Sequence, residues 1–209
     1  MTGNIEEASK AFAESATSSQ TAGNIRAAVF ALWYQAKLEM IGGRLRSAEE
    51  FLRRAQRLAG DQDEQPLSAV GIVHVGMAEL LYERGDLDGA ERYLKEGIEL
   101  GKRGSEAKVL VLSYVNMARV LMARGDAKHS LTKIQEAWRL AQWTSAGTWP
   151  PVDAWRARLL LAQGDVGSAA RWSREYEKIH PSADYVSRSG FYACRKRREG
   201  VCIDRVHGP

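Results

Sequence analysis

The chain has 209 residues, 44% hydrophobic and 27% charged, so it is long enough for one or two domains and too apolar to be disordered throughout. Its 30 Lys and Arg against 26 Asp and Glu give a net charge of +4, which does not by itself indicate nucleic-acid binding, and its two cysteines exclude a disulfide scaffold. It lacks the roughly 18 to 20 consecutive apolar residues of a membrane span and the basic, apolar start of a signal peptide, so we expect a cytoplasmic protein with no membrane contact.

A repeat of about forty residues organises the sequence. Its glycines recur at steps of 42, 40 and 39 residues: Gly43, Gly85, Gly125 and Gly164. An alanine lies seven residues before each glycine, and a small residue lies five residues after it: Ala36 and Ala48, Ala78 and Ala90, Ala118 and Ser130, Ala157 and Ala169. Glycine can adopt the left-handed conformation that ends a helix, and small residues let two helices approach closely. The repeat therefore predicts antiparallel helix hairpins.

The predicted elements follow this spacing along the chain. A half repeat at 3–17 would supply only a second helix, because only Met1 and Thr2 precede Gly3, and would leave Ile5, Ala8 and Phe12 on an exposed apolar side. Four hairpins follow, at about 25–59, 66–101, 106–142 and 150–180. A polar residue after the glycine caps the second helix in four of the five units: Asn4, Asp86, Asp126 and Asp165.

Stacking of these hairpins predicts an all-α, tetratricopeptide-like α-solenoid, a right-handed superhelix whose first helices line a concave face. The unit is about six residues longer than the 34-residue tetratricopeptide repeat, which predicts extended loops between hairpins, in GDQDEQPLS, ELGKRGSEAK and WTSAGTWPP. The repeat domain would span 1–181. Residues 182–209 would form a basic tail, solvated or disordered, or else able to bind nucleic acid through the RKRR run at 195–198.

Three stretches carry a family resemblance: GMAELLYERGDLDGAERYLKEGIELGKR, LSYVNMARVLMARGD and ARLLLAQGDVGSAARW. Together they resemble the helical-repeat region of MalT-like, ATP-dependent LuxR-type transcription regulators, over roughly residues 25–185. Members of that family also carry an N-terminal ATPase module and a C-terminal helix-turn-helix. The resemblance implies that the repeats sense an inducer or a regulatory protein and relay its binding to the ATPase.

The chain departs from the full family pattern. GGRLRS at 42–47 lacks the lysine of a phosphate-binding loop, and too few residues follow 181 for a helix-turn-helix. The resemblance therefore implies a regulatory context without ATP hydrolysis or sequence-specific DNA binding. We expect a fragment that lacks both modules. A DNA-associated factor acting through the basic tail and a non-functional remnant of a longer gene remain as alternatives.

No constellation of catalytic or metal-binding residues is recognisable in the sequence. His74, His129, His180 and His207 are scattered, and His74 is expected to pack within its hairpin. Cys194 and Cys202 lack the surrounding histidines of a zinc site. Acidic pairs such as Glu49 and Glu50 lie among arginines and indicate solvated ion pairs. We therefore expect no enzymatic activity, no cofactor and no metal.

The candidate binding site is the concave face of the first helices. Residues ten, six and three positions before each glycine share one helix face and form a charged ladder with apolar and aromatic flanks. The candidate residues are Trp33, Lys37, Glu79, Tyr82, Arg119, Met122 and Arg158. Arg119 and Arg158 could hold a carboxylate or phosphate, and Trp33 and Tyr82 could stack on an apolar group. The alternative is an ordinary solvated helix face.

We expect the groove to bind a protein, a peptide or a small-molecule inducer, with DNA bound only weakly through the tail. A second cluster of aromatic residues occurs late in the chain: Trp138, Trp143, Trp149, Trp155 and Trp172. These tryptophans are expected to form a local apolar cluster that holds the loop before residue 150, and Trp149 could instead stack on a ligand.

Overall fold

The computed structural model describes residues 3–60, 67–142 and 152–179. Within these residues the structure contains nine α-helices and no strand, which confirms the predicted all-α, tetratricopeptide-like solenoid. The helices are α1 (Gly3–Thr21), α2 (Ile25–Ile41), α3 (Leu45–Gly60), α4 (Leu67–Glu83), α5 (Leu87–Arg103), α6 (Ala107–Ala123), α7 (Ala127–Gln142), α8 (Val152–Ala162) and α9 (Val166–Ile179). The right-handed sense of the superhelix stays a prediction.

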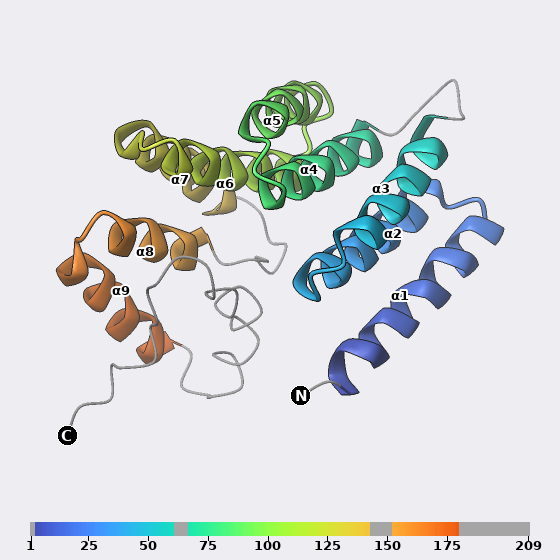
Figure 1. Cartoon of the computed structure of the whole chain (residues 1–209), viewed down its shortest axis with the longest axis horizontal. Helices are drawn as coiled ribbons and strands as arrows, with labels where there is room; N and C mark the ends of the chain where they lie inside the picture. The colour runs from blue at the N-terminus through green and yellow to red at the C-terminus, as the bar shows by residue number, and fades with distance from the viewer. Residues whose placement is uncertain (1–2, 61–66, 143–151, 180–209) are drawn as a thin grey trace.

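The helices pair as hairpins α2–α3, α4–α5, α6–α7 and α8–α9, which follow one another along an arch (Figure 1). The first helices of the hairpins, α2, α4, α6 and α8, pack against one another in that order. Helix α1 packs against α2 at one end of the arch. The first helices therefore form a continuous layer, which is the layer that carries the candidate site.

Left-handed glycines end the first helix of every hairpin, as the repeat predicts. The φ angle is 79° at Gly43, 83° at Gly85, 81° at Gly125 and 84° at Gly164. The Asp86 carboxylate accepts a hydrogen bond from the backbone N–H of Gly89 at 2.9 Å, which confirms its predicted role as a helix cap. Asp126 and Asp165 cap α7 and α9 in the same way. Asn4 is the second residue of α1, and its side chain is not described.

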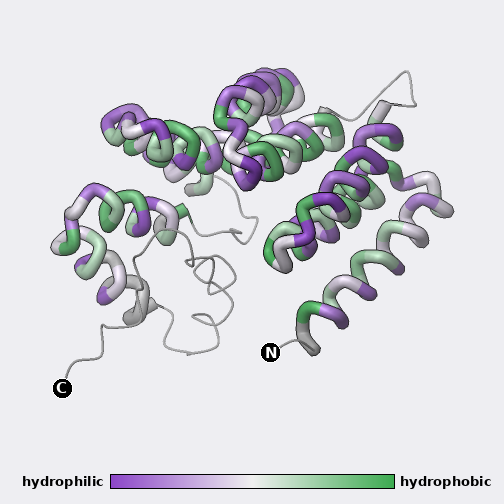
Figure 2. The backbone as a smooth tube through the Cα atoms, in the orientation of Figure 1, coloured by the Kyte–Doolittle hydropathy of each residue, from purple (hydrophilic) through white to green (hydrophobic). Residues whose placement is uncertain are grey.

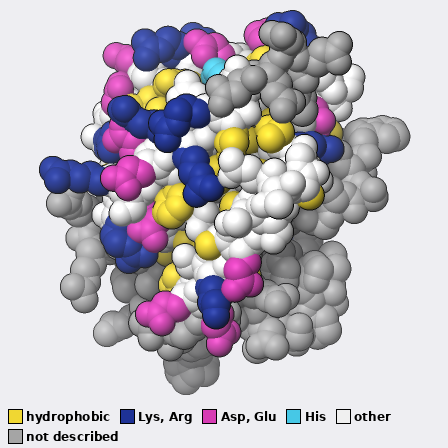
Figure 3. Space-filling model, turned by 90° about the vertical axis from the view of Figure 1, so that its right-hand side faces the viewer, with side chains coloured by type: hydrophobic (Ala, Val, Ile, Leu, Met, Phe, Trp, Pro, Cys, Tyr) yellow, Lys and Arg dark blue, Asp and Glu magenta, His cyan; other side chains and the backbone are white. Residues whose placement is uncertain are grey.

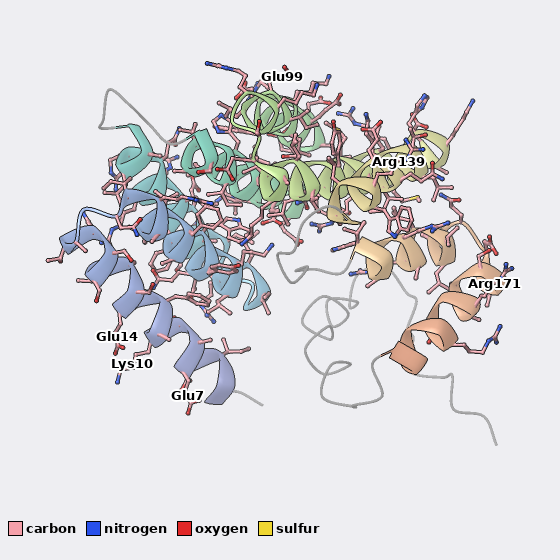
Figure 4. The ribbon with its side chains drawn as sticks, turned by 180° about the vertical axis from the view of Figure 1, so that it is seen from behind. Glu7, Lys10, Glu14, Glu99, Arg139 and Arg171 are labelled. Carbon is pink, nitrogen blue, oxygen red and sulfur yellow. The ribbon has the colours of Figure 1, made fainter. Side chains whose placement is uncertain are left out.

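Helix α1 differs from the predicted half repeat. It runs to Thr21, past the expected end at residue 17, and a turn at Gly23 (φ 73°) connects it to α2. The expectation of an exposed apolar side is wrong, because Ile5 and Ala8 are half-buried and the Phe12 ring stacks on Tyr34 at 4.8 Å between centroids. The opposite side of α1 is polar: Figure 4 shows Glu7, Lys10 and Glu14 pointing away from the other helices.

At the junction of α5 and α6, the added length of the repeat lies in the helices and not in the extended loop that the sequence predicts. Helices α4, α5 and α6 each have 17 residues, and only Gly104, Ser105 and Glu106 separate α5 from α6. Most of the expected ELGKRGSEAK loop is therefore helical. The other two expected loops, around 61–66 and 143–151, and the tail 182–209 lie outside the described residues.

The core follows the layered arrangement of the helices. Figure 2 shows α4 as largely hydrophobic, in keeping with its place between α2, α3, α5 and α6. The second helices α3, α5 and α7 are amphipathic, and each buries one apolar stripe that includes the predicted Leu52, Leu94 or Ile134. At the close approach of α6 and α7, the Ser130 hydroxyl donates a hydrogen bond to the Ala118 carbonyl at 2.8 Å. The small residues thus face each other across the hairpin, as predicted.

A recurring contact joins each hairpin to the one before it. The residue that precedes the turn glycine reaches the start of the preceding second helix: Arg84 contacts Glu49, and Arg124 contacts Glu91 and Asp88. At the next junction the Gln163 amide donates to the Ala127 carbonyl at 3.3 Å. Arg84 holds the pKa of Glu49 below its ordinary value near 4.5, with a smaller contribution from Arg53. These contacts set the register between neighbouring hairpins.

Replacing Gly85 with alanine tests the left-handed turn. A Cβ atom at this position meets no atom within 4 Å, so the cost comes from the backbone conformation alone. We expect Gly85→Ala to lower the free energy of unfolding by about 1 kcal/mol. Gly60→Ala is the matched control, because its Cβ is equally unobstructed and its φ is not positive. Equal urea unfolding midpoints for Gly85→Ala and Gly60→Ala would contradict the left-handed conformation at Gly85.

The Arg84–Glu49 contact predicts a pH dependence of stability. Because the pKa of Glu49 is lowered in the folded state, its contribution is present above about pH 4.5 and is lost as the pH falls through the folded-state pKa. We expect Arg84→Gln to lose less stability than the parent between about pH 6 and about pH 3.5 in urea unfolding. Arg57→Gln removes the same charge from an exposed side chain of α3 and should retain the parental pH dependence.

Candidate functional site

A polar ladder links the first helices at the predicted charged positions. The Lys37 ammonium of α2 donates to the Glu79 carboxylate of α4 at 2.7 Å, and the Asn116 amide of α6 donates to the same oxygen at 3.1 Å. The Arg119 guanidinium then donates to the Asn116 side-chain oxygen at 2.7 Å. We use the term polar ladder for Lys37, Glu79, Asn116 and Arg119.

Aromatic rings flank both ends of the polar ladder. At the N-terminal end, the Lys37 ammonium lies 4.9 Å from the centroid of Trp33. At the other end, the Arg119 guanidinium carbon lies 4.3 Å from the ring centroid of Tyr82 and 4.8 Å from that of Trp155. Such contacts stabilise the cations by an attraction to the ring faces.

The Arg119 end of the polar ladder has two more charged neighbours. Arg158 of α8 lies over the Trp155 ring, with its guanidinium carbon 4.6 Å from the centroid. Arg119 also contacts Glu83 of α4, at 3.4 Å. An arginine held between two aromatic rings and one carboxylate has a fixed orientation.

Exposure increases along the seven candidate residues toward the C-terminus. Three are buried: Trp33, Lys37 and Glu79. Three are half-buried: Tyr82, Arg119 and Met122. One is exposed: Arg158. The alternative of a solvated helix face is therefore wrong for Lys37 and Glu79, whose side chains are 8% and 6% exposed. The structure joins six of the seven through the ladder and its rings, whereas Met122 packs in the core near Ile134 and Leu159.

Three residues of this arrangement escaped the sequence analysis. Asn116 and Glu83 lie three or four positions from a predicted ladder residue of the same helix, Arg119 or Glu79, so helical spacing could have found them. Trp155 was assigned to the late aromatic cluster and instead lies between Arg119 and Arg158. Binding of a partner by the candidate residues stays a prediction.

The other sequence candidates have mixed outcomes. His74 packs within its hairpin as expected, with Nδ1 at 2.9 Å from the Val70 carbonyl and Nε2 at 3.0 Å from Glu96. Of the late tryptophans, Trp155 is buried and Trp138 is 38% exposed, and the expected cluster of all five stays a prediction. Trp143, Trp149, both cysteines, His180 and His207 lie outside the described residues, and the side chain of Trp172 is also not described.

Charge on the N-terminal part of the arch is mixed in sign. Figure 3 shows Lys and Arg side chains interspersed with Asp and Glu over the face seen there. In the described part of the chain, no three His, Cys, Asp or Glu side chains come close enough together to hold a metal ion. None of the described helices has both the length and the apolar character needed to cross a bilayer.

The polar ladder predicts a strong coupling between Lys37 and Glu79. Replacing Lys37 with methionine would leave a buried carboxylate without its cation, which costs about 3 kcal/mol. We expect Lys37→Met to lower the free energy of unfolding by that amount, and Lys37→Met/Glu79→Gln to recover more than half of the loss. Lys95→Met is the matched control, since Lys95 is 68% exposed in its pair with Glu91. Additive effects in the double variant, measured by urea unfolding, would contradict the coupling.

Comparisons with known proteins identify a family, related protein sequences and a solved structure of similar fold. Serine/threonine-protein kinase PknK of Mycobacterium tuberculosis and of Mycobacterium bovis is 50% identical to this chain over 50 residues. That segment is 24% of this chain and 4% of the length of PknK. BtubC (BKLC) from P. vanneervenii aligns over 96% of this chain and 98% of its own, with 14% identity and a TM-score of 0.43.

The family comparison covers nearly the whole chain. Residues 1–198 match the family described as the MalT-like TPR region. This span includes every helix described above and the whole polar ladder. The chain therefore belongs to the MalT-like TPR region family.

Proposed function

We propose that this chain is the non-enzymatic sensing module of a MalT-like, LuxR-type transcription regulator and acts in the cytoplasm. Its layer of first helices would bind a regulatory protein, a peptide or a small inducer, and the bound state would be relayed to effector domains elsewhere in the regulator. Family membership over residues 1–198 supports the regulatory setting. The observation that carries the binding role is the preorganised Arg119 end of the polar ladder.

The chemistry of that end favours an anionic group attached to an apolar body. Arg119 is oriented by Tyr82, Trp155 and Glu83, while Arg158 is exposed above the same Trp155 ring. Guanidinium groups recognise carboxylates and phosphates through paired hydrogen bonds, and the flanking rings offer flat apolar surface. We therefore propose that the ligand places a carboxylate or phosphate at Arg158 and Arg119.

A second setting is supported by the match to PknK. That protein is named a serine/threonine-protein kinase, and it shares 50 residues with this chain at 50% identity. A sensing module of the same kind could therefore regulate a kinase rather than a LuxR-type factor. The binding chemistry proposed for Arg119 and Arg158 is the same in both settings.

Selection from a random dodecapeptide library displayed on phage tests the proposed binding. We expect acidic peptides to be enriched on the parent chain and their affinity, measured by fluorescence anisotropy, to fall about tenfold or more in Arg158→Glu. Arg57→Glu, an equal charge reversal on the exposed face of α3, should bind like the parent. Selected peptides that bind Arg158→Glu and Arg57→Glu with equal affinity would contradict the proposed binding site.

A labelled DNA duplex tests the alternative of a DNA-associated factor. DNA binding through the basic tail would fall steeply with salt and would disappear when residues 190–209 are removed. We expect the parent chain to bind the duplex more weakly than the selected peptides at about 0.15 M salt. The opposite order of affinities, together with loss of DNA binding on truncation, would replace the proposal with that alternative.

A further inference from the structure

A second cavity with binding chemistry lies between α7 and α8, apart from the polar ladder. It has a volume of about 240 Å3 and is lined by Gln135, Trp138 and Arg139 of α7 and by Arg156 of α8. The three residues of α7 follow helical spacing and share one face of that helix. Trp138 is one of the few large apolar side chains exposed in the described part of the chain. The cavity thus combines an accessible indole with two guanidinium groups.

The two arginines of this cavity have no polar partner among the residues that the structure describes. Neither Arg139 nor Arg156 forms an ion pair or hydrogen bond with any of those residues. Lys133, one turn earlier on α7, is instead paired with Glu136. In the cavity between α1 and α2, Arg44 is likewise held by Glu39. Of these two cavities, the α7–α8 cavity is therefore the one whose arginines have no carboxylate partner in the described part of the chain.

The α7–α8 cavity is distinct from the site proposed around Arg119 and Arg158. Arg156 and Arg158 are two residues apart on α8, which places their side chains roughly 200° apart around the helix. Viewed down the axis of α8, Trp155 lies between Arg156 and Arg158, and its side chain is buried against the apolar core of α6 and α7. Figure 4 shows Arg139 on α7 and Arg171 on α9 at the same end of the arch. A substitution of Arg156 can therefore be tested without changing the surface around Arg158, on the other side of α8.

We propose that this cavity binds an acidic peptide segment of a partner protein, with an aromatic or aliphatic side chain against Trp138 and flanking carboxylates at Arg139 and Arg156. The volume accommodates one large side chain, and two separated guanidinium groups match carboxylates on both sides of it. A nucleic-acid strand would need a continuous positive groove along its backbone, whereas the neighbouring Lys133 is paired with Glu136. Charge complementarity therefore favours an acidic peptide.

Three labelled peptides test this proposal on the full chain. They carry a phenylalanine flanked by two aspartates, two lysines or two serines, each between glycine-serine spacers. We expect the aspartate peptide to bind at least about tenfold more tightly than the other two, because only its charges complement the arginines. Arg139→Glu/Arg156→Glu and Trp138→Ala should each weaken its binding about tenfold or more. Fluorescence anisotropy measures the affinities, and circular dichroism verifies that the variants remain helical.

Matched variants separate this site from the rest of the surface. Arg171→Glu/Arg174→Glu is an equal double charge reversal at exposed residues of α9 and should bind the aspartate peptide like the parent. Arg158→Glu reports on the polar-ladder site: loss of aspartate-peptide binding in Arg158→Glu but not in Arg139→Glu/Arg156→Glu would place the peptide at the polar ladder, overturning this proposal and leaving the proposed function standing. Equal binding of the three peptides, an unchanged affinity in Arg139→Glu/Arg156→Glu, or tighter binding of a single-stranded oligonucleotide at about 0.15 M salt would overturn the proposal.

Discussion

Close approach of paired helices is the constraint on which this structure depends. Each hairpin places an alanine of its first helix opposite a small residue of its second, and a left-handed glycine lets the chain reverse between them. The same closeness recurs between hairpins, because Gly101 in α5 leaves room for the Leu110 side chain of α6, where a Cβ atom would lie 2.8 Å from Leu110 Cγ. Larger residues at these positions would hold the helices apart and break the continuous layer that contains the polar ladder.

The sequence revealed the hairpins because their signals are local and repeat at a fixed spacing. It predicted a loop over ELGKRGSEAK but not how short the turn at 104–106 is, where the left-handed residue is Ser105, at φ 51°, rather than glycine. Of the two glycines in that segment, Gly104 follows the end of α5, whereas Gly101 is a helical residue at a close helix contact. Local composition cannot distinguish these two uses of glycine, since only the position of the neighbouring helix decides between them.

The candidate site shows the same difference between what local spacing predicts and what only helix packing decides. Helical spacing correctly placed Lys37, Glu79 and Arg119 on facing sides of successive helices, so the ladder itself could be anticipated. Burial could not, because it depends on how tightly α2, α4 and α6 pack. As a result, one end of the ladder stabilises the stacking of helices, while the end near Arg158 remains accessible. A single row of charges thus combines a structural half with a half suited to recognition, which is consistent with a module that senses a ligand and transmits its presence through helix packing.

The contacts between hairpins are not chemically equivalent, and this has a consequence for how the arch responds to its surroundings. Arg84 and Arg124 join their neighbours through carboxylates, whereas Gln163 makes the corresponding contact with a neutral amide. Acid or high ionic strength would therefore loosen the first two junctions and spare the last one. In acid or at high salt the N-terminal hairpins would then be joined by their shared apolar core and the buried part of the polar ladder, whereas α8 would keep its polar contact with α7.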